Sequence, residues 1–492
     1  MKILLFALNG SYTHTNLAVR CLRKPLEDAG FEVQILERNL RDRTSHVLQD
    51  LVAAQADVVS FSTYIWNVRF MLELARDLKS VCPNCRIVLG GPEVSYDTDR
   101  FEGEDNAYID AIVCGEGEIA LTELCKRLRD GLPIPRVWDN ACSKQVSLSG
   151  SGILYRKDDF PEGSMLYYES SRGCPYACAY CLSSAQKGVR YKEVTEVIDD
   201  LKAFEAIPNH IKIIKFVDRT FNFNPNRANA IWGALLDERF TRNYHFEICA
   251  SLLNEESFEI LKQFPKGKIQ LEVGLQSTYA PTLQAVSRHI DPQDVLSKVR
   301  RVYEMGNIHV HLDLITGLPY EGYERFAQSF DEAYACCDLL QLGFLKLLHG
   351  TSLRNRAEEY GYCYMHEPPY TVLQSHWMTF SELSRLGAIA EVLERYRESG
   401  KFDRCLTTVL NGLRSPFRFF EGLCDYIKTH DGRHIQKISQ VDAYRLLWEY
   451  VTTLGDTALL STFSEAMHKD FSAVEVRKVP LFLKQSGNST IH

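Results

Sequence analysis

Three cysteines, Cys174, Cys178 and Cys181, lie close together in the stretch 171-SRGCPYACAYC-181. A [4Fe–4S] cluster takes four ligands, so the spacing C-x3-C-x2-C supplies one thiolate fewer than a cluster needs and keeps one iron open for an exogenous ligand. A zinc knuckle would want a second Cys or His pair about 12 to 20 residues away. The nearest histidine after the third cysteine is His210, and no second pair follows. The spacing therefore predicts an iron–sulfur cluster.

The neighbours of these cysteines carry a more specific signal. Arg172-Gly173 precede the first cysteine, and an aromatic residue, Tyr180, precedes the last. With them the stretch resembles the signature of the radical S-adenosylmethionine (SAM) superfamily. The resemblance implies that SAM chelates the open iron and that an electron from the cluster cleaves SAM to methionine and a 5′-deoxyadenosyl radical. The protein then holds and shields that chemistry, with Tyr180 a candidate cofactor contact.

Bulk properties limit the class of protein. A chain of 492 residues suggests roughly three domains, and its 45% hydrophobic and 24% charged residues are ordinary for a globular protein. The net charge of −8 argues against a general nucleic-acid-binding surface. The apolar run Met1–Leu8 is too short for a signal peptide or a membrane span. Free thiols and an oxygen-labile cluster are typical of a reducing cytoplasm, here in an anaerobic or microaerobic cell.

Residues 1–135 alternate short apolar runs with amphipathic stretches, which is the pattern of a parallel sheet with crossover helices. The pattern predicts helices such as Ala18–Ala29 and Phe70–Val81. It predicts strands at Lys2–Leu8, Glu32–Glu37, Asp57–Ser62, Arg86–Leu89 and Ala111–Cys114. This order predicts a doubly wound, flavodoxin-like domain that binds a ligand past the carboxyl ends of its strands.

The loops at those strand ends are rich in glycine, serine and aromatic residues, and glycine lets a backbone approach a ligand closely. Together they resemble the cobalamin-binding domain of the cobalamin-dependent radical SAM family. The resemblance implies that the third and fourth loops receive the nucleotide tail and the corrin edge of cobalamin. The candidate contacts are Asn9, Ser11, Tyr12 and Thr13; Ser60, Ser62, Thr63, Tyr64 and Trp66; Gly90, Gly91, Pro92 and Glu93; and Gly115, Glu116 and Gly117.

One feature of cobalamin domains is missing from the sequence. Domains that place a histidine under the corrin carry D-x-H-x-x-G, and no histidine of this chain follows an aspartate at that spacing. His14 lies in the first loop but outside that motif, where a loop hydrogen bond explains it better. We therefore expect the lower face of a bound cobalamin to lack a histidine ligand.

The rest of the chain divides into three segments. Residues 136–164 are short, polar and rich in Gly and Ser, which predicts a linker. Residues 165–358 return to strand–helix alternation, with strands expected at Met165–Ser170, Ile211–Val217, His245–Cys249, Ile269–Val273, His309–Ile315 and Leu339–Leu347. Six such units match the partial barrel of radical SAM proteins. Residues 359–492 predict an α-helical domain, with helices at Ser375–Leu386, Ala388–Ser399, Pro416–Thr429, Ser439–Leu454 and Asp456–His468.

The ends of the predicted barrel strands carry groups that suit SAM. Asp218 could hold the SAM ammonium by a charge-assisted hydrogen bond, or it could cap its loop or pair with Arg219. The segment from Glu272 to Gln276 resembles the family motif E-x-G-x-Q-S, which implies contacts from both side chains to SAM. By the same resemblance Arg288 meets the SAM carboxylate and Thr316 lies along the adenine.

The leading hypothesis is an enzyme that uses a [4Fe–4S] cluster, SAM and cobalamin to transfer a methyl group to an unactivated carbon. An alternative keeps the cobalamin but performs a rearrangement or cyclisation. A methylthiotransferase and a non-catalytic cobalamin or cluster sensor rank lower, because the first domain lacks three suitably spaced cysteines and a sensor needs no SAM site. The resemblance implies a small-molecule or peptide substrate, an electron donor such as flavodoxin or ferredoxin, no membrane partner, and a monomer or weak oligomer.

Overall fold

The computed structural model describes residues 1–139, 146–157, 160, 163, 165–185 and 188–474. The chain forms two compact units. Unit 1 comprises residues 1–271, 346–357 and 364–371, and unit 2 comprises residues 272–345, 358–363 and 372–492. The predicted linker and the C-terminal end fall partly outside the described residues. None of the helices in the described part of the chain has the length and apolarity needed to cross a membrane.

The first sheet of unit 1 is wholly parallel and has the strand order β2-β1-β3-β4-β5-β6. This is the flavodoxin-like order with one short strand added at the edge. Its strands are β1 Lys2–Asn9, β2 Glu32–Asn39, β3 Val58–Ser62, β4 Arg86–Gly90, β5 Ala111–Val113 and β6 Val137–Trp138. The five predicted strands are confirmed, and only the edge strand, which begins the expected linker, was not predicted.

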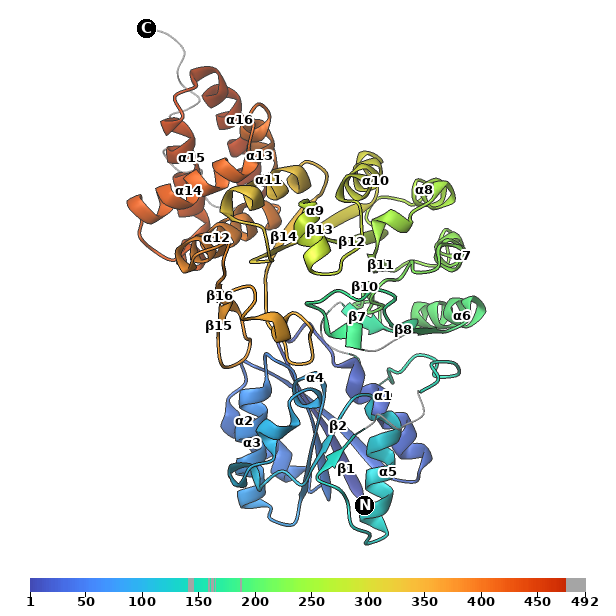
Figure 1. Ribbon diagram of the computed structural model, residues 1–492. Helices are drawn as coiled ribbons and strands as arrows, with labels where there is room; N and C mark the ends of the chain where they lie inside the picture. The colour runs from blue at the N-terminus through green and yellow to red at the C-terminus, as the bar shows by residue number, and fades with distance from the viewer. Residues whose placement is uncertain (140–145, 158–159, 161–162, 164, 186–187, 475–492) are drawn as a thin grey trace. The chain divides into compact units, whose positions relative to one another are not determined.

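Helices cover both faces of this sheet, α1 and α5 on one side and α2 and α3 on the other (Figure 1). Alternate residues of β1 explain the two layers: Leu4 and Phe6 pack with α2 and α3, whereas Ile3 and Leu5 pack with α1 and α5. The helices are α1 Leu17–Asp28, α2 Thr44–Ala53, α3 Val68–Val81, α4 Pro92–Ser95 and α5 Gly117–Arg129, with single turns at η1 Thr98–Phe101 and η2 Glu104–Asn106.

The second sheet has the strand order β14-β13-β12-β11-β10-β7, with the parallel pairing expected of a partial barrel. All six predicted strands are confirmed: β7 Met165–Tyr168, β10 Ile213–Phe216, β11 Asn243–Ile248, β12 Ile269–Gln276, β13 His309–Thr316 and β14 Leu339–Phe344. In unit 1 the helices α6 Val194–Glu205, α7 Pro225–Leu235 and α8 Glu255–Leu261 lie on one side of their strands (Figure 1), and η5 Ala250–Leu252 follows β11.

In unit 2 the barrel helices are α9 Ala280–Ala285, α10 Pro292–Glu304 and α11 Tyr323–Tyr334. Short elements follow: η6 Arg354–Arg356 belongs to unit 1, β15 Cys363–Tyr364 has one residue in each unit, and β16 Val372–Gln374 belongs to unit 2. The C-terminal helices then gather into one group (Figure 1). They are α12 Phe380–Leu393, η7 Glu394–Glu398, α13 Asp403–Leu410, α14 Pro416–His430, η8 Ile435–Lys437, α15 Gln440–Thr453 and α16 Thr457–Val474.

The structure corrects one helix boundary in the C-terminal domain. The sequence predicted two helices that meet near Gly387, but α12 runs through this residue and continues as the π-helical turn η7. A glycine inside a helix costs about 1 kcal/mol relative to alanine. Burial of Leu386 and Ile389 on either side of it offsets that cost. The last helix, which the sequence predicted from Asp456, is capped by this residue, whose Oδ1 accepts from the backbone N–H groups of residues 458 and 459 at 3.0 Å each.

Candidate functional site

A cavity of about 390 Å³ opens in unit 1 at the carboxyl ends of β3, β4 and β5. The helices α1 and α5 form its sides, and small residues line it where the strands end. On the barrel side it is bordered by Gly173 and Leu182, which flank the three cysteines in sequence, and by Val217 and Arg219 after β10. A cavity past the carboxyl ends of a doubly wound sheet is the usual ligand position in this fold.

The loop after β4 is built for close packing. Gly91 has a φ of +112°, and a Cβ atom there would collide with the carbonyl oxygen of Thr63. The Thr63 hydroxyl donates to the Gly90 carbonyl at 2.7 Å. The Ser95 hydroxyl donates to the Gly91 carbonyl at 2.7 Å and accepts from the Gly115 N–H at 3.0 Å. These bonds hold the loops after β3, β4 and β5 together. They keep the backbone of residue 91 so close to Thr63 that only glycine fits there.

The structure gathers nine of the sixteen predicted cobalamin contacts around this cavity. They are Ser60, Ser62, Tyr64, Gly90, Gly91, Pro92, Gly115, Glu116 and Gly117. Asn9, Ser11, Tyr12, Thr13, Thr63, Trp66 and Glu93 are absent from the lining, and their role stays a prediction. No histidine is among the lining residues in the described part of the chain.

Aromatic and acidic residues of these loops have other partners. Tyr64 stacks on Trp66 with 4.3 Å between ring centroids, and burial raises the pKa of Tyr64. Glu93 is buried, which raises the pKa of its carboxyl group, and it accepts a short hydrogen bond from Tyr370. Arg100 lies 3.6 Å from the same carboxylate. Glu93 therefore ties its loop to the segment 364–371, which is also part of unit 1.

The three cysteines lie on a loop that an antiparallel hairpin closes. Its strands are β8 Ser171–Gly173 and β9 Val189–Tyr191, and the single turn η4 Leu182–Ala185 follows the last cysteine. Gly173 has a φ of +103°, and a side chain there would collide with the Gly188 carbonyl. Burial is the largest cause of the raised pKa of the Cys174 thiol, and Cys174 lies 3.6 Å from the Thr220 hydroxyl. Three thiols on one short loop suit an iron–sulfur cluster with an open iron.

Asp218 holds the chain segment that leads into this hairpin. Its fully buried carboxylate accepts from the Ser170 N–H at 2.8 Å and from the hydroxyls of Ser170 and Ser171 at 2.6 Å each. Burial raises the pKa of Asp218, against the effect of these hydrogen bonds. The Arg227 guanidinium donates to the Ser170 carbonyl at 3.0 Å. A contact between Asp218 and SAM stays a prediction. What the structure shows is that Asp218 holds the residues at the start of the hairpin by hydrogen bonds.

In unit 2 two of the predicted SAM contacts, Gln276 and Thr316, are the last residues of β12 and β13. Gln276 has a φ of +72°, which is uncommon outside glycine. A side chain at Gly274 would collide with the Gln276 amide, and the Gly274 carbonyl accepts a short hydrogen bond from Arg288. The Gln276 Oε1 and the Thr316 hydroxyl are buried and have no hydrogen-bond partner within the described residues. Buried polar atoms of this kind require an explanation, and a polar ligand is one.

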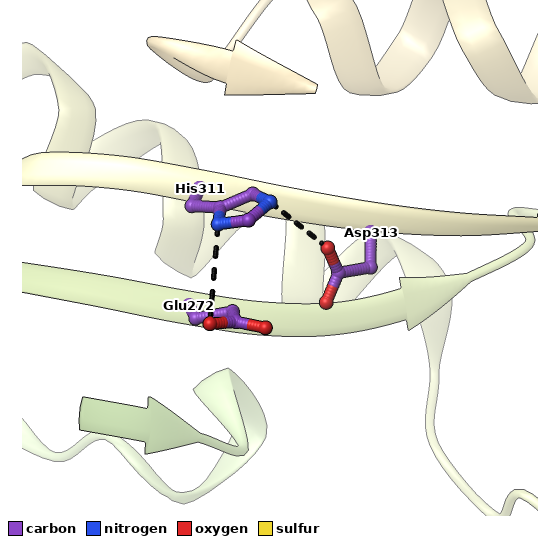
Figure 2. Close-up of side chains that lie close together, drawn as sticks. All are labelled: Glu272, His311 and Asp313. Atoms are coloured by element: carbon purple, nitrogen blue, oxygen red, sulfur yellow. Dashed lines mark ion pairs between the residues drawn. The ribbon is translucent and has the colours of Figure 1, made fainter. Parts of the chain in front are cut away.

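Glu272, also on β12, belongs to a cluster that the sequence did not predict. Figure 2 shows the His311 ring between two carboxylates, with Nδ1 4.0 Å from Glu272 Oε2 and Nε2 3.1 Å from Asp313 Oδ1. The ligand atoms are close enough for a metal ion. Glu272 Oε2 and Asp313 Oδ1 are nearest to opposite nitrogens of the ring, and one ligand atom from each of the three residues lies within 4.8 Å of the other two.

Family models match three parts of the chain. The B12 binding domain model matches residues 4–125, the radical SAM superfamily model matches residues 168–333, and a protein family of unknown function, DUF4080, matches residues 358–491. The predicted boundaries at residues 135, 164 and 358 stay predictions.

The chain is similar to curated methyltransferases. It is 27% identical over 302 residues to the cobalamin-dependent radical SAM methyltransferase TokK of Streptomyces tokunonensis, covering 55% of this chain and 44% of TokK. It is 25% identical over 334 residues to an uncharacterised methyltransferase of Pyrococcus horikoshii, covering 62% of this chain and 71% of that protein. The chain thus spans less than half the length of TokK and about seven tenths of the Pyrococcus protein.

Among solved structures, the cobalamin-dependent SAM radical enzyme OxsB, with aqua-cobalamin and SAM bound, matches with a TM-score of 0.64. The match covers 100% of this chain and 84% of OxsB at 15% sequence identity. At this identity the match shows a shared fold and does not extend to a shared reaction.

Proposed function

We propose that this chain, in which family models match a B12 binding domain and a radical SAM domain, is a cobalamin-dependent radical SAM methyltransferase. The observation that carries the proposal is the cavity of the first sheet, because the hairpin that holds the three cysteines borders it. A chain that binds cobalamin in that cavity and a cluster on that hairpin would hold both cofactors within one compact unit.

The residues present fit the three cofactors. The cluster would supply an electron to cleave SAM, and cobalamin would carry a methyl group. Cys174, Cys178 and Cys181 would hold the cluster. Small residues of the strand ends, such as Ser60 and Gly90, leave room for a large planar ligand and its tail. The Gln276 Oε1 and the Thr316 hydroxyl are buried without a hydrogen-bond partner among the described residues, so polar groups of SAM could bond to them.

Side chains of this protein would bind and orient the SAM molecule that is cleaved. In this proposal Glu272 and Gln276 contact the ribose or the amino group of SAM, and Arg288 its carboxylate. Asp218 stabilises the entrance of the cysteine hairpin by its three hydrogen bonds. The methyl acceptor is a small molecule or a peptide, and a cytoplasmic flavodoxin or ferredoxin supplies the electrons.

The test begins with anaerobic reconstitution of the cluster, addition of hydroxocobalamin, and desalting. We expect about one corrin per chain. Its visible absorption spectrum should lack the features of a nitrogenous lower ligand. Under reducing conditions SAM should then give both 5′-deoxyadenosine and S-adenosylhomocysteine, because the second product forms only when a methyl group leaves SAM.

A cysteine control makes the test specific. Cys178→Ala should abolish 5′-deoxyadenosine formation, whereas Cys363→Ala, which removes an exposed thiol, should not change it. Retained corrin with 5′-deoxyadenosine but no S-adenosylhomocysteine would favour the rearrangement or cyclisation alternative. Cleavage of SAM without retained corrin would contradict the cobalamin assignment.

A further inference from the structure

A buried ion network connects the cavity of the first sheet to the cysteine hairpin within unit 1. At its centre is Arg172, which lies on β8 two residues before the first cysteine. Its Nη1 lies 2.7 Å from Glu118 Oε1 and 3.3 Å from Glu116 Oε2. On the other side of the guanidinium, Nε and Nη2 donate to the two Glu169 oxygens at 2.9 and 2.7 Å.

The members of the network come from distant parts of the sequence. Glu116 and Glu118 follow β5 in the B12-binding domain, whereas Glu169 follows β7 and Arg172 lies on β8 of the hairpin. Arg190, on the second strand of the hairpin, makes a short ion pair with Glu116. Both strands of the hairpin are therefore anchored to the same loop of the first sheet.

The network is enclosed and also lines the cavity. The exposed fractions of the side chains are 16% for Arg172, 8% for Glu118, and 17% each for Glu116 and Glu169. All four residues border the cavity. Ion pairing with Glu169 and Glu118 outweighs the effect of burial, so the pKa of Arg172 is raised and its charge is fixed. A planar guanidinium that meets carboxylates on two edges holds its partners in a defined orientation, which lysine cannot reproduce.

A buried ion pair by itself is weak evidence for a stabilising role. Another pair in unit 1, Lys192 with Asp200, is more deeply buried, at 2% and 8% exposed, and does not border this cavity. The Arg172 network differs from it because it joins the wall of one cofactor cavity to the backbone that carries the cluster ligands. Gly173 alone separates Arg172 from Cys174, so a displacement of Arg172 would pass to the first thiol.

We propose that Arg172 and its carboxylate partners Glu116, Glu118 and Glu169 are positioning residues that set the distance between cobalamin in the cavity and the cluster on the hairpin. The inference rests on the proposed function, because it requires that both cofactors bind. It concerns their separation rather than the binding of either one.

The test uses the full chain loaded with both cofactors. With cobalamin in its Co(II) state and the cluster reduced, both centres are paramagnetic, so electron paramagnetic resonance reports their magnetic coupling and hence their separation. We expect the Arg172→Lys and Glu118→Gln variants to keep stoichiometric corrin and iron but to show an altered coupling. For Arg172→Lys we expect S-adenosylhomocysteine formation to fall about 100-fold, since a misplacement of about 1 Å can cost that much.

Asp110→Asn is the matched control, because it breaks a partly buried ion pair of the same unit, with Lys79, away from both the cavity and the hairpin. It should lower the melting temperature while leaving the magnetic coupling unchanged. Unchanged coupling in Arg172→Lys, with both cofactors bound, would overturn the inference and leave the proposed function standing. Failure of the unmodified chain to retain corrin would instead defeat the proposed function.

Discussion

At the scale of the residue, His311 is the side chain whose surroundings make the sharpest prediction. Its ring lies between Glu272 and Asp313 (Figure 2), with one ring nitrogen nearest to each carboxylate. In His311→Gln the two carboxylates would lose the ring that separates them, and Glu272 would lose its orientation. We expect the dissociation constant for SAM to rise about tenfold, equivalent to about 1.4 kcal/mol. Isothermal titration of the anaerobic, cluster-loaded protein would measure it.

His309 offers the matched control for this prediction. It lies on the same strand two residues earlier, is more exposed, and faces Asp338 rather than Glu272. His309→Gln should therefore leave SAM binding unchanged. If His311→Gln binds SAM as tightly as the unmodified chain does, the histidine has no part in orienting Glu272. Loss of a stoichiometric divalent metal in that variant would indicate a metal site instead.

At the scale of the element, the π-helical turn η7 has a measurable electrostatic consequence. Burial, with a smaller contribution from Glu394, raises the pKa of Glu398 from its ordinary 4.5 to about 7. Between these values the folded chain binds more protons than the unfolded chain, so the free energy of unfolding falls as pH rises. The Glu398→Gln variant has no carboxyl group at this position, so its free energy of unfolding does not fall with pH for this reason. We expect its melting temperature to exceed that of the unmodified chain at pH 8 and the difference to shrink toward pH 5.

Calorimetry across this pH range, with Glu465→Gln as the control, would check the prediction. Glu465 is an exposed glutamate on α16, so neutralising it should not change the pH dependence of the melting temperature. A constant difference between Glu398→Gln and the unmodified chain at every pH would mean that the Glu398 carboxyl group titrates normally.

The elements themselves could be predicted wherever a local pattern decides them. The strands β1 and β13 were found within one residue of their ends, because the continuous apolar run of β1 and the alternating apolar residues of β13 both end at polar or glycine-rich loops. The break expected in α12 at Gly387 was wrong, because the propensity of one glycine is weaker than the burial of its neighbours. The helix α13 was not predicted, although Cys405 and Val409 on it are buried at helical spacing.

At the scale of the whole molecule, contacts between distant segments could not be predicted. The cysteines were found because their spacing is local. The partnership of Arg172 with Glu118 spans 54 residues, and the sequence indicated a cobalamin contact for Glu116 but no arginine partner for either glutamate. The same holds for Glu93 and Tyr370, which are 277 residues apart. Sequence patterns place side chains on a face or in a loop, whereas the partner across a fold depends on how whole elements pack.

The division into two units gives a final prediction about the chain as a whole. Every residue that lines the cavity of the first sheet belongs to unit 1, so a ligand that fills it should stabilise that unit alone. A ligand at 100 times its dissociation constant adds about 2.7 kcal/mol to the free energy of unfolding. For a unit of this size that corresponds to a rise of roughly 4 °C in melting temperature. We therefore expect hydroxocobalamin to move one calorimetric transition of the cluster-free chain and not the other. Cobinamide, which lacks the nucleotide tail, should move it less, because the tail would otherwise contact the loops after β3 and β4 that line the cavity. Equal shifts with both corrins would show that these loops do not take the tail, and no shift with either would contradict corrin binding in the cavity.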